Sequence, residues 1–218
     1  MTANPAMRTR GCGAIPATGP ASDDFTLREE PWSLFQDWMA EAARSEPNDP
    51  NAMALATSGA DGLPDVRIML LKAFDARGFV FFTNDQSTKG EELVENAQAA
   101  IVLHWKSLRR QVRARGSVTR LSPEDADLYF ASRPRESRIG AHASRQSQPL
   151  VDRATLEREV AAASVRFDGG PVPRPAHWSG YRIAPVSIEF WQDGAFRLHD
   201  RIRFMKDGPG WRRLRLYP

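Results

Sequence analysis

The chain has 218 residues, 41% of them hydrophobic and 26% charged, which is the composition of a globular protein with one large domain or two small ones. The 30 lysines and arginines against 27 aspartates and glutamates give a net charge of +3, and this small excess does not favour a nucleic-acid partner. One cysteine, and no apolar run near the roughly 18 residues of a membrane span, exclude a disulfide framework, a zinc site of cysteine pairs and a transmembrane helix, and predict a cytoplasmic protein.

The N-terminal part of the chain predicts an arm followed by one helix. Residues 1–24 are rich in Gly, Pro, Ala, Ser and Thr and lack periodic apolar positions, which is typical of a flexible arm. Residues 25–218 are expected to form a single domain. It begins with an amphipathic helix, because Trp32, Phe35 and Met39 recur at three- and four-residue spacing before Pro47.

Three short strands are predicted next. They cover residues 52–57, 66–74 and 79–83, with turns at 59–62 and 77–78. Parallel pairing needs crossovers of a dozen or more residues, so these short connections favour an antiparallel meander.

Helices and further strands alternate in the rest of the chain. A short helix begins near residue 88, with either Ser87 as its N-cap or Thr88 in a capping box with Glu91. Further helices are predicted to begin at Ser122-Pro123 and at Asp152. Strands are predicted over 99–105, 111–121, 181–191, 201–206 and 211–216, and an extended linker over 171–175. Because strands dominate and helices lie between them, the sequence predicts a mainly β fold, an antiparallel barrel with peripheral helices.

Several common catalytic motifs are absent from the sequence. There is no Gly-x-Gly-x-x-Gly after a strand, no P-loop and no His-Glu-x-x-His. The four histidines are scattered without a close ligand pair, so we expect no metal site. No activated cysteine or serine elbow is present, which disfavours nucleophilic hydrolysis.

Basic and hydroxyl side chains occur in patterns suited to two anions. Arg67 and Lys72 bracket an apolar strand, and alternation places them on opposite faces unless a bulge intervenes. After Thr83, a hydroxyl-rich loop leads into a helix start with Lys89, where amide hydrogens, the helix dipole and the lysine form a competent phosphate cradle. The alternatives are snorkelling surface bases and an ordinary capped helix.

A second group of donors recurs at four-residue spacing. Tyr129, Arg133 and Ser137 supply a phenol, a guanidinium and a hydroxyl, three donors for one phosphate. Pro134 is expected to break the helix, so a loop must bring Ser137 back. The alternative is a solvated helix end.

A guanidinium and an imidazole are close together near the C-terminus. Arg197 and His199 are two residues apart, so on a strand they share a face, with Arg201 two residues further on. Side by side they can cover a flat, electron-poor aromatic ring. A polar face lining the barrel is the alternative.

In this order and spacing, the four stretches resemble the pyridoxine/pyridoxamine 5′-phosphate oxidase family, together with Gln146-Ser147 and the C-terminal tail from Trp211. The likeness runs from about Trp32 to Pro218. It implies an FMN-binding split barrel and a homodimer with FMN at the subunit interface. It also implies oxidation of pyridoxamine or pyridoxine 5′-phosphate to pyridoxal 5′-phosphate in vitamin B6 biosynthesis, with O2 reduced to H2O2.

The resemblance also assigns roles to individual residues. Arg197 and His199 match the pair that covers the substrate ring, and Asp49 matches an active-site carboxylate. The substrate phosphate is expected to bind Lys72, Tyr129, Arg133 and Ser137. FMN is expected to bind Arg67, Ile68, Met69, Leu70, Leu71, Lys72, Phe82, Thr83, Ser87, Thr88, Lys89, Gln111, Gln146, Ser147, Trp191 and Arg201, with several of these donated by the second subunit.

Three departures from the family pattern stand out. Thr88 is found where many members have a second basic residue, and Phe82 replaces a frequent tyrosine. The lid motif that some members carry near the N-terminus is absent from residues 1–24.

Three other functions compete with the oxidase. The first is a paralogous split-barrel flavin oxidase of phenazine-type biosynthesis, which has no use for a substrate-phosphate pocket. The second is a flavin or vitamer carrier without turnover, which does not need Arg197 and His199. The third is nucleic-acid binding through Arg109, Arg110, Arg113 and Arg115. Alternation disfavours it, because it puts Arg113 and Arg115 on one face of the strand with Gln111 and the other two arginines elsewhere.

Overall fold

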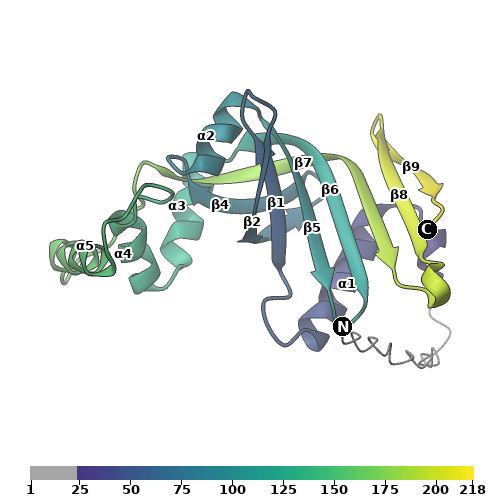
Figure 1. Cartoon of the computed structure of the whole chain (residues 1–218), viewed down its shortest axis with the longest axis horizontal. Helices are drawn as coiled ribbons and strands as arrows, with labels where there is room; N and C mark the ends of the chain where they lie inside the picture. Colours follow the sequence, from purple (N-terminus) through teal and green to yellow (C-terminus); the bar gives the residue numbers. More distant parts are fainter. Residues whose placement is uncertain (1–23) are drawn as a thin grey trace, which may run out of the picture.

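The computed structural model describes residues 24–218, whose strands form one curled antiparallel sheet with helices around it (Figure 1). The mainly β fold predicted from the sequence is confirmed. The predicted arm lies outside the described residues, except for Asp24, whose carboxylate caps the 3-10 helix η1 (Phe25–Leu27). The other helices are α1 (Pro31–Ser45), α2 (Thr88–Glu95), α3 (Pro123–Ser132), α4 (Arg135–Ala143), α5 (Arg153–Arg166) and the 3-10 helix η2 (Ala195–Arg197), and the strands are β1 (Ala52–Ser58), β2 (Pro64–Leu70), β3 (Ala73–Asp75), β4 (Gly78–Asn84), β5 (Gln98–Trp105), β6 (Arg110–Arg120), β7 (Trp178–Gln192), β8 (Asp200–Asp207) and β9 (Gly210–Arg215).

The sheet is built around the long strand β7. Its order is β2-β1-β5-β6-β7-β4-β3, and β8 pairs with the C-terminal half of β7 and then with β9. The predicted antiparallel pairings between neighbouring strands are confirmed, because β1 pairs with β2 and β3 pairs with β4. The predicted continuous meander is wrong, because β2 and β3 lie at opposite ends of the strand order and the other side of β4 pairs with β7.

The predicted single strand over 66–74 is also wrong, because it divides at Leu71 and Lys72. The Leu71 amide donates to the carbonyl of Asn51 over 2.9 Å, and the Lys72 amide donates to the carbonyl of Val80 over 2.8 Å. The backbone thus changes its partner from the β1 side to β4 within one residue. Buried Leu71 anchors this corner in the core, and alternation along a continuous strand does not apply across it.

Helix α1 fills the concave side of the sheet. Pro31 stands at its first position and the Glu30 carboxylate accepts the amides of Trp32 and Ser33, each over 2.8 Å, so the helix starts with satisfied donors. The ring of buried Trp38 lies 5.2 Å from that of Phe190 on β7. Burying a side chain of this size stabilises a fold by about 1.5–3 kcal/mol, which fixes α1 against the sheet.

Three helices project from the other end of the molecule (Figure 1). Helix α3 begins as predicted, because the Ser122 hydroxyl accepts the amide of Asp125 over 3.1 Å, and α5 begins at the predicted cap Asp152. Helix α4 was not predicted, and Pro134 is its N-cap. The longest helix of residues 24–218, α1, has 15 residues, and no helix in this range combines the length and apolar character that crossing a membrane requires.

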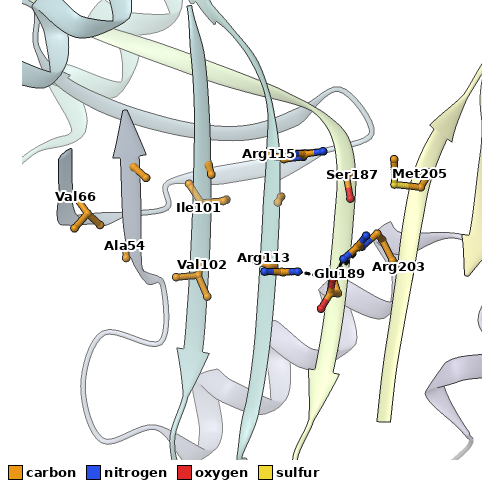
Figure 2. Close-up of a pocket in the computed structure, with 13 residues that line it drawn as sticks. Ala54, Val66, Ile101, Val102, Arg113, Arg115, Ser187, Glu189, Arg203 and Met205 are labelled. Atoms are coloured by element: carbon orange, nitrogen blue, oxygen red, sulfur yellow. Dashed lines mark hydrogen bonds and ion pairs between the residues drawn. The ribbon is translucent and has the colours of Figure 1, made fainter. Parts of the chain in front are cut away.

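The face of the sheet opposite α1 is open and hollowed. Small side chains line it, including Ala54 and Ala100, and the hollow has a volume of about 400 Å³. Figure 2 shows Glu189 at its edge between Arg113 and Arg203. The Glu189 side chain is 3% exposed and its carboxylate accepts hydrogen bonds from Arg113 (2.9 Å), Arg201 (2.7 Å) and Arg203 (2.8 Å). A buried carboxylate with three guanidinium partners is an electrostatic centre of this face.

Replacing this carboxylate is expected to destabilise the fold at neutral pH. Burial raises the pKa of Glu189, but the hydrogen bonds from the three arginines outweigh burial and hold the pKa below its ordinary value. A lowered pKa contributes stability above the ordinary carboxyl pKa of about 4.3, and this contribution is lost as the pH falls through the folded-state pKa. Because the arginines are partly exposed, we expect Glu189→Gln to cost about 2 kcal/mol, or about 4–8 °C in Tm.

Thermal unfolding at neutral and acid pH checks this prediction. The difference between wild type and Glu189→Gln is expected to shrink below about pH 4. The control is Glu157→Gln, which removes an exposed pair with Arg153 and is expected to cost less than about 0.5 kcal/mol. Equal Tm losses in the two variants would contradict the prediction.

Candidate functional site

The N-terminus of helix α2 carries a buried lysine. Lys89 is 5% exposed, and among the described residues its Nζ has one hydrogen-bond partner, Ser87 Oγ at 3.1 Å. Ser87 is the N-cap residue, but its hydroxyl donates to the carbonyl of Asn84 and does not cap the helix. The predicted capping box is wrong, because Thr88 is the first residue of the helix. Burial lowers the pKa of Lys89 and the neighbouring Arg67 lowers it further, so the position favours an added anion.

Arg67 on β2 lies next to Lys89. Its Nη2 is 2.5 Å from the Asp65 carboxylate and 3.2 Å from that of Glu92, and its Nη1 contacts the Thr57 hydroxyl. Arg67, Ser87 and Lys89 are called the α2 cluster below. The structure thus brings these three predicted residues together. It adds Glu92, a carboxylate that sequence spacing did not single out.

The side chain of Asp85 fixes the loop that leads into α2. Its Oδ1 accepts the Tyr181 hydroxyl and its Oδ2 accepts the Ser179 hydroxyl, both over 2.8 Å, and Arg120 pairs with the same carboxylate. Burial, followed by the hydrogen bond to Asp85, raises the pKa of the Tyr181 phenol. A Cβ on Gly90 would lie 2.2 Å from the carbonyl of Asp85, so only glycine lets the helix approach this loop so closely.

The four predicted substrate-phosphate residues line one pocket between β2 and helices α3 and α4. Lys72, Tyr129, Arg133 and Ser137 surround a hollow of about 490 Å³, together with Ile68, Met69 and Leu70. Ser137 was expected on a loop, but it lies in the first turn of α4. This set, with Trp178 and Phe82, is called the α3–α4 pocket below.

Arg133 is the most unusual group in the α3–α4 pocket. Its guanidinium carbon lies 4.9 Å from the centre of the Trp178 ring, and its buried Nη1 has no hydrogen-bond partner among the described residues. Burial lowers the pKa of this guanidinium. Phe82 stacks between Tyr129 (4.0 Å) and Trp178 (5.1 Å). A desolvated cation on a rigid aromatic stack is prepared for an anion that supplies the missing hydrogen bond.

A neighbouring hollow extends the pocket toward the loop after α4. Thr83 and Gln146 line it together with Arg133 and Ser137. The buried Oγ1 of Thr83 also has no partner within residues 24–218. Ser147 is exposed in the turn after α4, with φ of 71°.

Five further predicted residues gather at the opposite end of β7. Gln111 on β6 is paired with Trp191 on β7, which is paired with Arg201 on β8. The His199 ring packs against the Trp191 ring at 4.7 Å. Arg197 and His199 were expected on one strand face, but they lie on η2 and the loop after it. This group is called the β7-end cluster below.

The loop that carries Arg197 has a strained backbone. Phe196 and Arg197 are consecutive non-glycine residues with φ of 57° and 64°. Each left-handed residue costs about 1–2 kcal/mol, and such strain is found where function requires a fixed geometry. The Arg197 side chain is exposed at the tip of this loop.

Within one chain, the α3–α4 pocket and the β7-end cluster lie far apart. Trp178, in the α3–α4 pocket, and Trp191, in the β7-end cluster, are 13 residues apart on one strand, a path of about 40 Å. Figure 1 shows β7 running from the side of α3 and α4 to the side of β8. The α3–α4 pocket and the β7-end cluster are therefore separate surfaces of a single chain.

Two predicted residues remain apart from these surfaces, and one aromatic was missed. Asp49 is exposed in the loop before β1, with φ of 40°, and does not line the α3–α4 pocket. The Leu71 side chain lies in the core, so only its backbone is available to a ligand. The missed aromatic is Trp178, whose ring packs against the Arg133 guanidinium. Trp178 is the first residue of β7, and no sequence pattern pointed to it.

Comparison with known proteins identifies the family. The family model described as pyridoxamine 5′-phosphate oxidase matches residues 39–167, and the model of the pyridoxine 5′-phosphate oxidase C-terminal dimerisation region matches residues 178–218. The chain belongs to the pyridoxamine 5′-phosphate oxidase family. The resemblance inferred from the four sequence stretches is confirmed.

Relatives within the oxidase family are similar over almost their full length. A pyridoxine/pyridoxamine 5′-phosphate oxidase of Brucella anthropi is 58% identical over 91% of this chain and 98% of its own. One from Azorhizobium caulinodans is also 58% identical, over 90% of this chain and 94% of its own.

Solved structures confirm the fold. The PhzG protein of Burkholderia lata, solved with tetrahydrophenazine-1-carboxylic acid, has a TM-score of 0.84 and 34% identity, covering 94% of this chain and all of its own. An FMN-binding protein of Nostoc punctiforme related to the oxidase family has a TM-score of 0.71 at 14% identity, which supports the split-barrel fold alone.

Proposed function

We propose that this protein oxidises pyridoxamine and pyridoxine 5′-phosphate to pyridoxal 5′-phosphate, with FMN as cofactor and O2 as final electron acceptor. The observation that carries the proposal is the α3–α4 pocket, where Lys72, Tyr129 and Ser137 line the same hollow as Arg133, whose buried Nη1 has no partner among residues 24–218. Relatives 58% identical to the chain carry the name of this oxidase.

The residues of the α2 cluster fit the phosphate of FMN. Lys89 is buried beside a single hydroxyl partner, and a helix N-terminus adds its dipole to the positive charge. Arg67 stands beside it, held by Asp65 and Glu92. FMN supplies the ring that accepts two electrons from the substrate. The strand segment from Ile68 to Lys72, between this cluster and the α3–α4 pocket, would contact that ring.

The chain's own residues would position the substrate. In the α3–α4 pocket, Arg133 offers its unpaired Nη1 to the substrate phosphate, with Lys72, Tyr129 and Ser137 as further donors. This phosphate is remote from the reacting carbon, so its binding energy orients the ring. Arg197 and His199 would cover the ring from the side opposite to FMN. No protein nucleophile is needed.

A homodimer would unite the separated halves of the site. The C-terminal segment, residues 178–218, matches a dimerisation region and contains most of the β7-end cluster. The hollowed sheet face lies between that cluster and β2, so a second copy seated there would bring its own Arg197 and His199 to this chain's α3–α4 pocket. Each of the two sites, with FMN at the interface, would then use both chains.

The experiment that tests the proposed function is anaerobic mixing. The purified protein reconstituted with FMN is expected to lose its yellow absorbance when pyridoxamine 5′-phosphate is added without oxygen, and to regain it on admission of air with release of H2O2. A protein that binds FMN but keeps its colour would contradict the oxidase and support a carrier. A protein that binds no FMN would contradict both.

Lys89 is expected to control retention of the cofactor. Replacing it with methionine removes a buried, charge-assisted hydrogen bond, so Lys89→Met should raise the Kd for FMN about 10- to 100-fold. Quenching of flavin fluorescence measures this Kd. The exposed Lys106 supplies the control, Lys106→Met, with an unchanged Kd. Equal affinities of wild type and Lys89→Met would remove Lys89 from the phosphate site.

The similarity to PhzG favours one alternative, an oxidase of a phenazine precursor. Such a substrate carries no phosphate, so its turnover would not depend on Arg133. Comparing pyridoxamine 5′-phosphate with pyridoxamine as substrates separates the two functions, because the proposed oxidase is expected to turn over the phosphorylated substrate far faster and a phenazine-precursor oxidase is not. The cytoplasmic location expected from the single cysteine stays a prediction.

A further inference from the structure

In the loop between β7 and β8, the Asp193 carboxylate contacts the ring of His199. Asp193 Oδ1 lies 3.1 Å from His199 Nδ1, and both side chains are largely buried, at 16% and 18% exposed. The imidazole ring also packs against the Trp191 ring. Asp193 thus makes a polar side-chain contact with this ring from the same loop.

Two groups compete for the same ring nitrogen. The amide of Gly194 donates toward His199 Nδ1 over 3.2 Å, which needs a lone pair on Nδ1. The Asp193 carboxylate accepts only if Nδ1 carries the proton. A neutral imidazole satisfies one of these partners and not both. The identity of residue 193 therefore decides which tautomer His199 adopts.

We propose that Asp193 is a positioning residue that holds the proton of His199 on Nδ1, so that Nε2 presents a lone pair to the substrate. A hydrogen bond to an ionised carboxylate is about twice as strong as one between neutral groups, so Asp193 prevails over the Gly194 amide. This inference rests on the proposed function only for its last step, the contact of Nε2 with a donor on the substrate ring.

Arg109 fixes the carboxylate itself. Its guanidinium pairs with Asp193 Oδ2, and its carbonyl accepts the Asp193 amide over 3.0 Å. The second oxygen of Asp193 is thereby occupied, and Oδ1 is left facing the imidazole. A Cβ on Gly194 would lie 2.1 Å from the Leu198 carbonyl, so only glycine fits at this position of the closely packed loop. Arg109, Asp193 and His199 form a chain of three side chains that ends at the proposed substrate.

The tautomer of His199 can be measured directly. Long-range ¹H–¹⁵N NMR of the FMN-loaded dimer labelled in histidine distinguishes the two tautomers, at about pH 8, above the ordinary imidazole pKa of about 6.5. The signals of His199 are assigned by their absence in His199→Asn. Wild type is expected to carry the proton on Nδ1. In Asp193→Ala and Asp193→Leu, neither of which can accept, the Gly194 amide is unopposed and the proton is expected on Nε2.

Kinetics then test the consequence for turnover. Groups that orient a functional histidine typically contribute 10- to 100-fold, so kcat/KM for pyridoxamine 5′-phosphate is expected to fall about 10- to 100-fold in both variants, at unchanged FMN content. The control is Asp200→Asn, whose carboxylate neighbours His199 in sequence but pairs with Arg215, with tautomer and kcat/KM unchanged.

The outcomes separate this inference from the proposed function. A wild-type proton on Nε2, or an unchanged tautomer in both variants, overturns the inference whatever the activity. A shifted tautomer with unchanged kcat/KM overturns its link to the substrate. If wild type shows the Nδ1 proton and the variants lose it, but no preparation oxidises pyridoxamine 5′-phosphate, the proposed function fails and the positioning role of Asp193 stands.

Discussion

Replacing Arg197 with methionine is expected to lower kcat/KM for pyridoxamine 5′-phosphate about 100- to 1000-fold, with no loss of bound FMN. Arg197 is exposed at the tip of a strained loop, beside the Asp193–His199 pair. An exposed side chain on such a backbone does little for the fold, and strain of this kind is typical of binding and catalytic sites. A guanidinium over an aromatic ring contributes about 2 kcal/mol when desolvated, and a charge-assisted hydrogen bond about 1.5–3 kcal/mol.

Steady-state kinetics with saturating FMN, together with the ratio of flavin to protein absorbance, check this prediction. The matched control is Arg212→Met, because Arg212 is an exposed arginine on β9, outside the proposed site. Turnover by Arg197→Met within threefold of wild type would remove Arg197 from the active site. A large loss of FMN would assign it to the cofactor instead.

Arg133→Met is expected to raise KM for the phosphorylated substrate about 100- to 1000-fold. The guanidinium is desolvated on Trp178 with one nitrogen unpaired, so a bound phosphate would gain two charge-assisted hydrogen bonds without breaking any protein contact. Methionine keeps the contact with the aromatic stack but not the charge. Because binding is lost and the reacting atoms are untouched, kcat is expected to change much less than KM.

Unphosphorylated pyridoxamine supplies the internal control for Arg133. Its slow oxidation is expected to be the same in wild type and Arg133→Met, because it has no phosphate to lose. Arg145→Met, at an exposed arginine paired with Glu159, controls for general charge effects. An equal loss with both substrates would show that Arg133 supports the fold and does not bind phosphate.

The sequence patterns succeeded where structure is local. Alternation along residues 111–121 correctly placed Gln111, Arg113 and Arg115 on one side of β6, opposite the buried Val112 and Ala114. The start signals of α3 and α5 were correct, because a capping side chain acts within three residues of the helix start.

The patterns failed where the chain changes direction through distant contacts. Nothing within residues 66–74 indicates that the Lys72 amide bonds to Val80 and not to the β1 side. Strand alternation also failed for Arg197, because Phe196 and Arg197 have left-handed backbone conformations and do not lie on a strand. Pro134 was correctly expected to end a helix, but the same residue begins α4, which positions Ser137.

The separation of the two half-sites could not be predicted from spacing. Trp178 starts and Trp191 nearly ends the same strand, and the length of β7 becomes known only when its pairing with β4, β6 and β8 is seen. Sequence order gives no sign that residues assigned to one site lie about 40 Å apart along one strand.

The most direct test of a site shared between two chains is complementation. Arg133→Met and Arg197→Met subunits carrying different affinity tags are co-expressed, and the mixed dimers are counted by double purification. If each site takes Arg133 from one chain and Arg197 from the other, a mixed dimer has one intact site and one doubly altered site. Because Arg133→Met keeps much of its kcat, the activity compared is kcat/KM, measured with substrate well below KM. Random pairing is then predicted to restore about a quarter of the wild-type kcat/KM, and purified mixed dimers about half. Mixed dimers no more active than either parent would contradict the account.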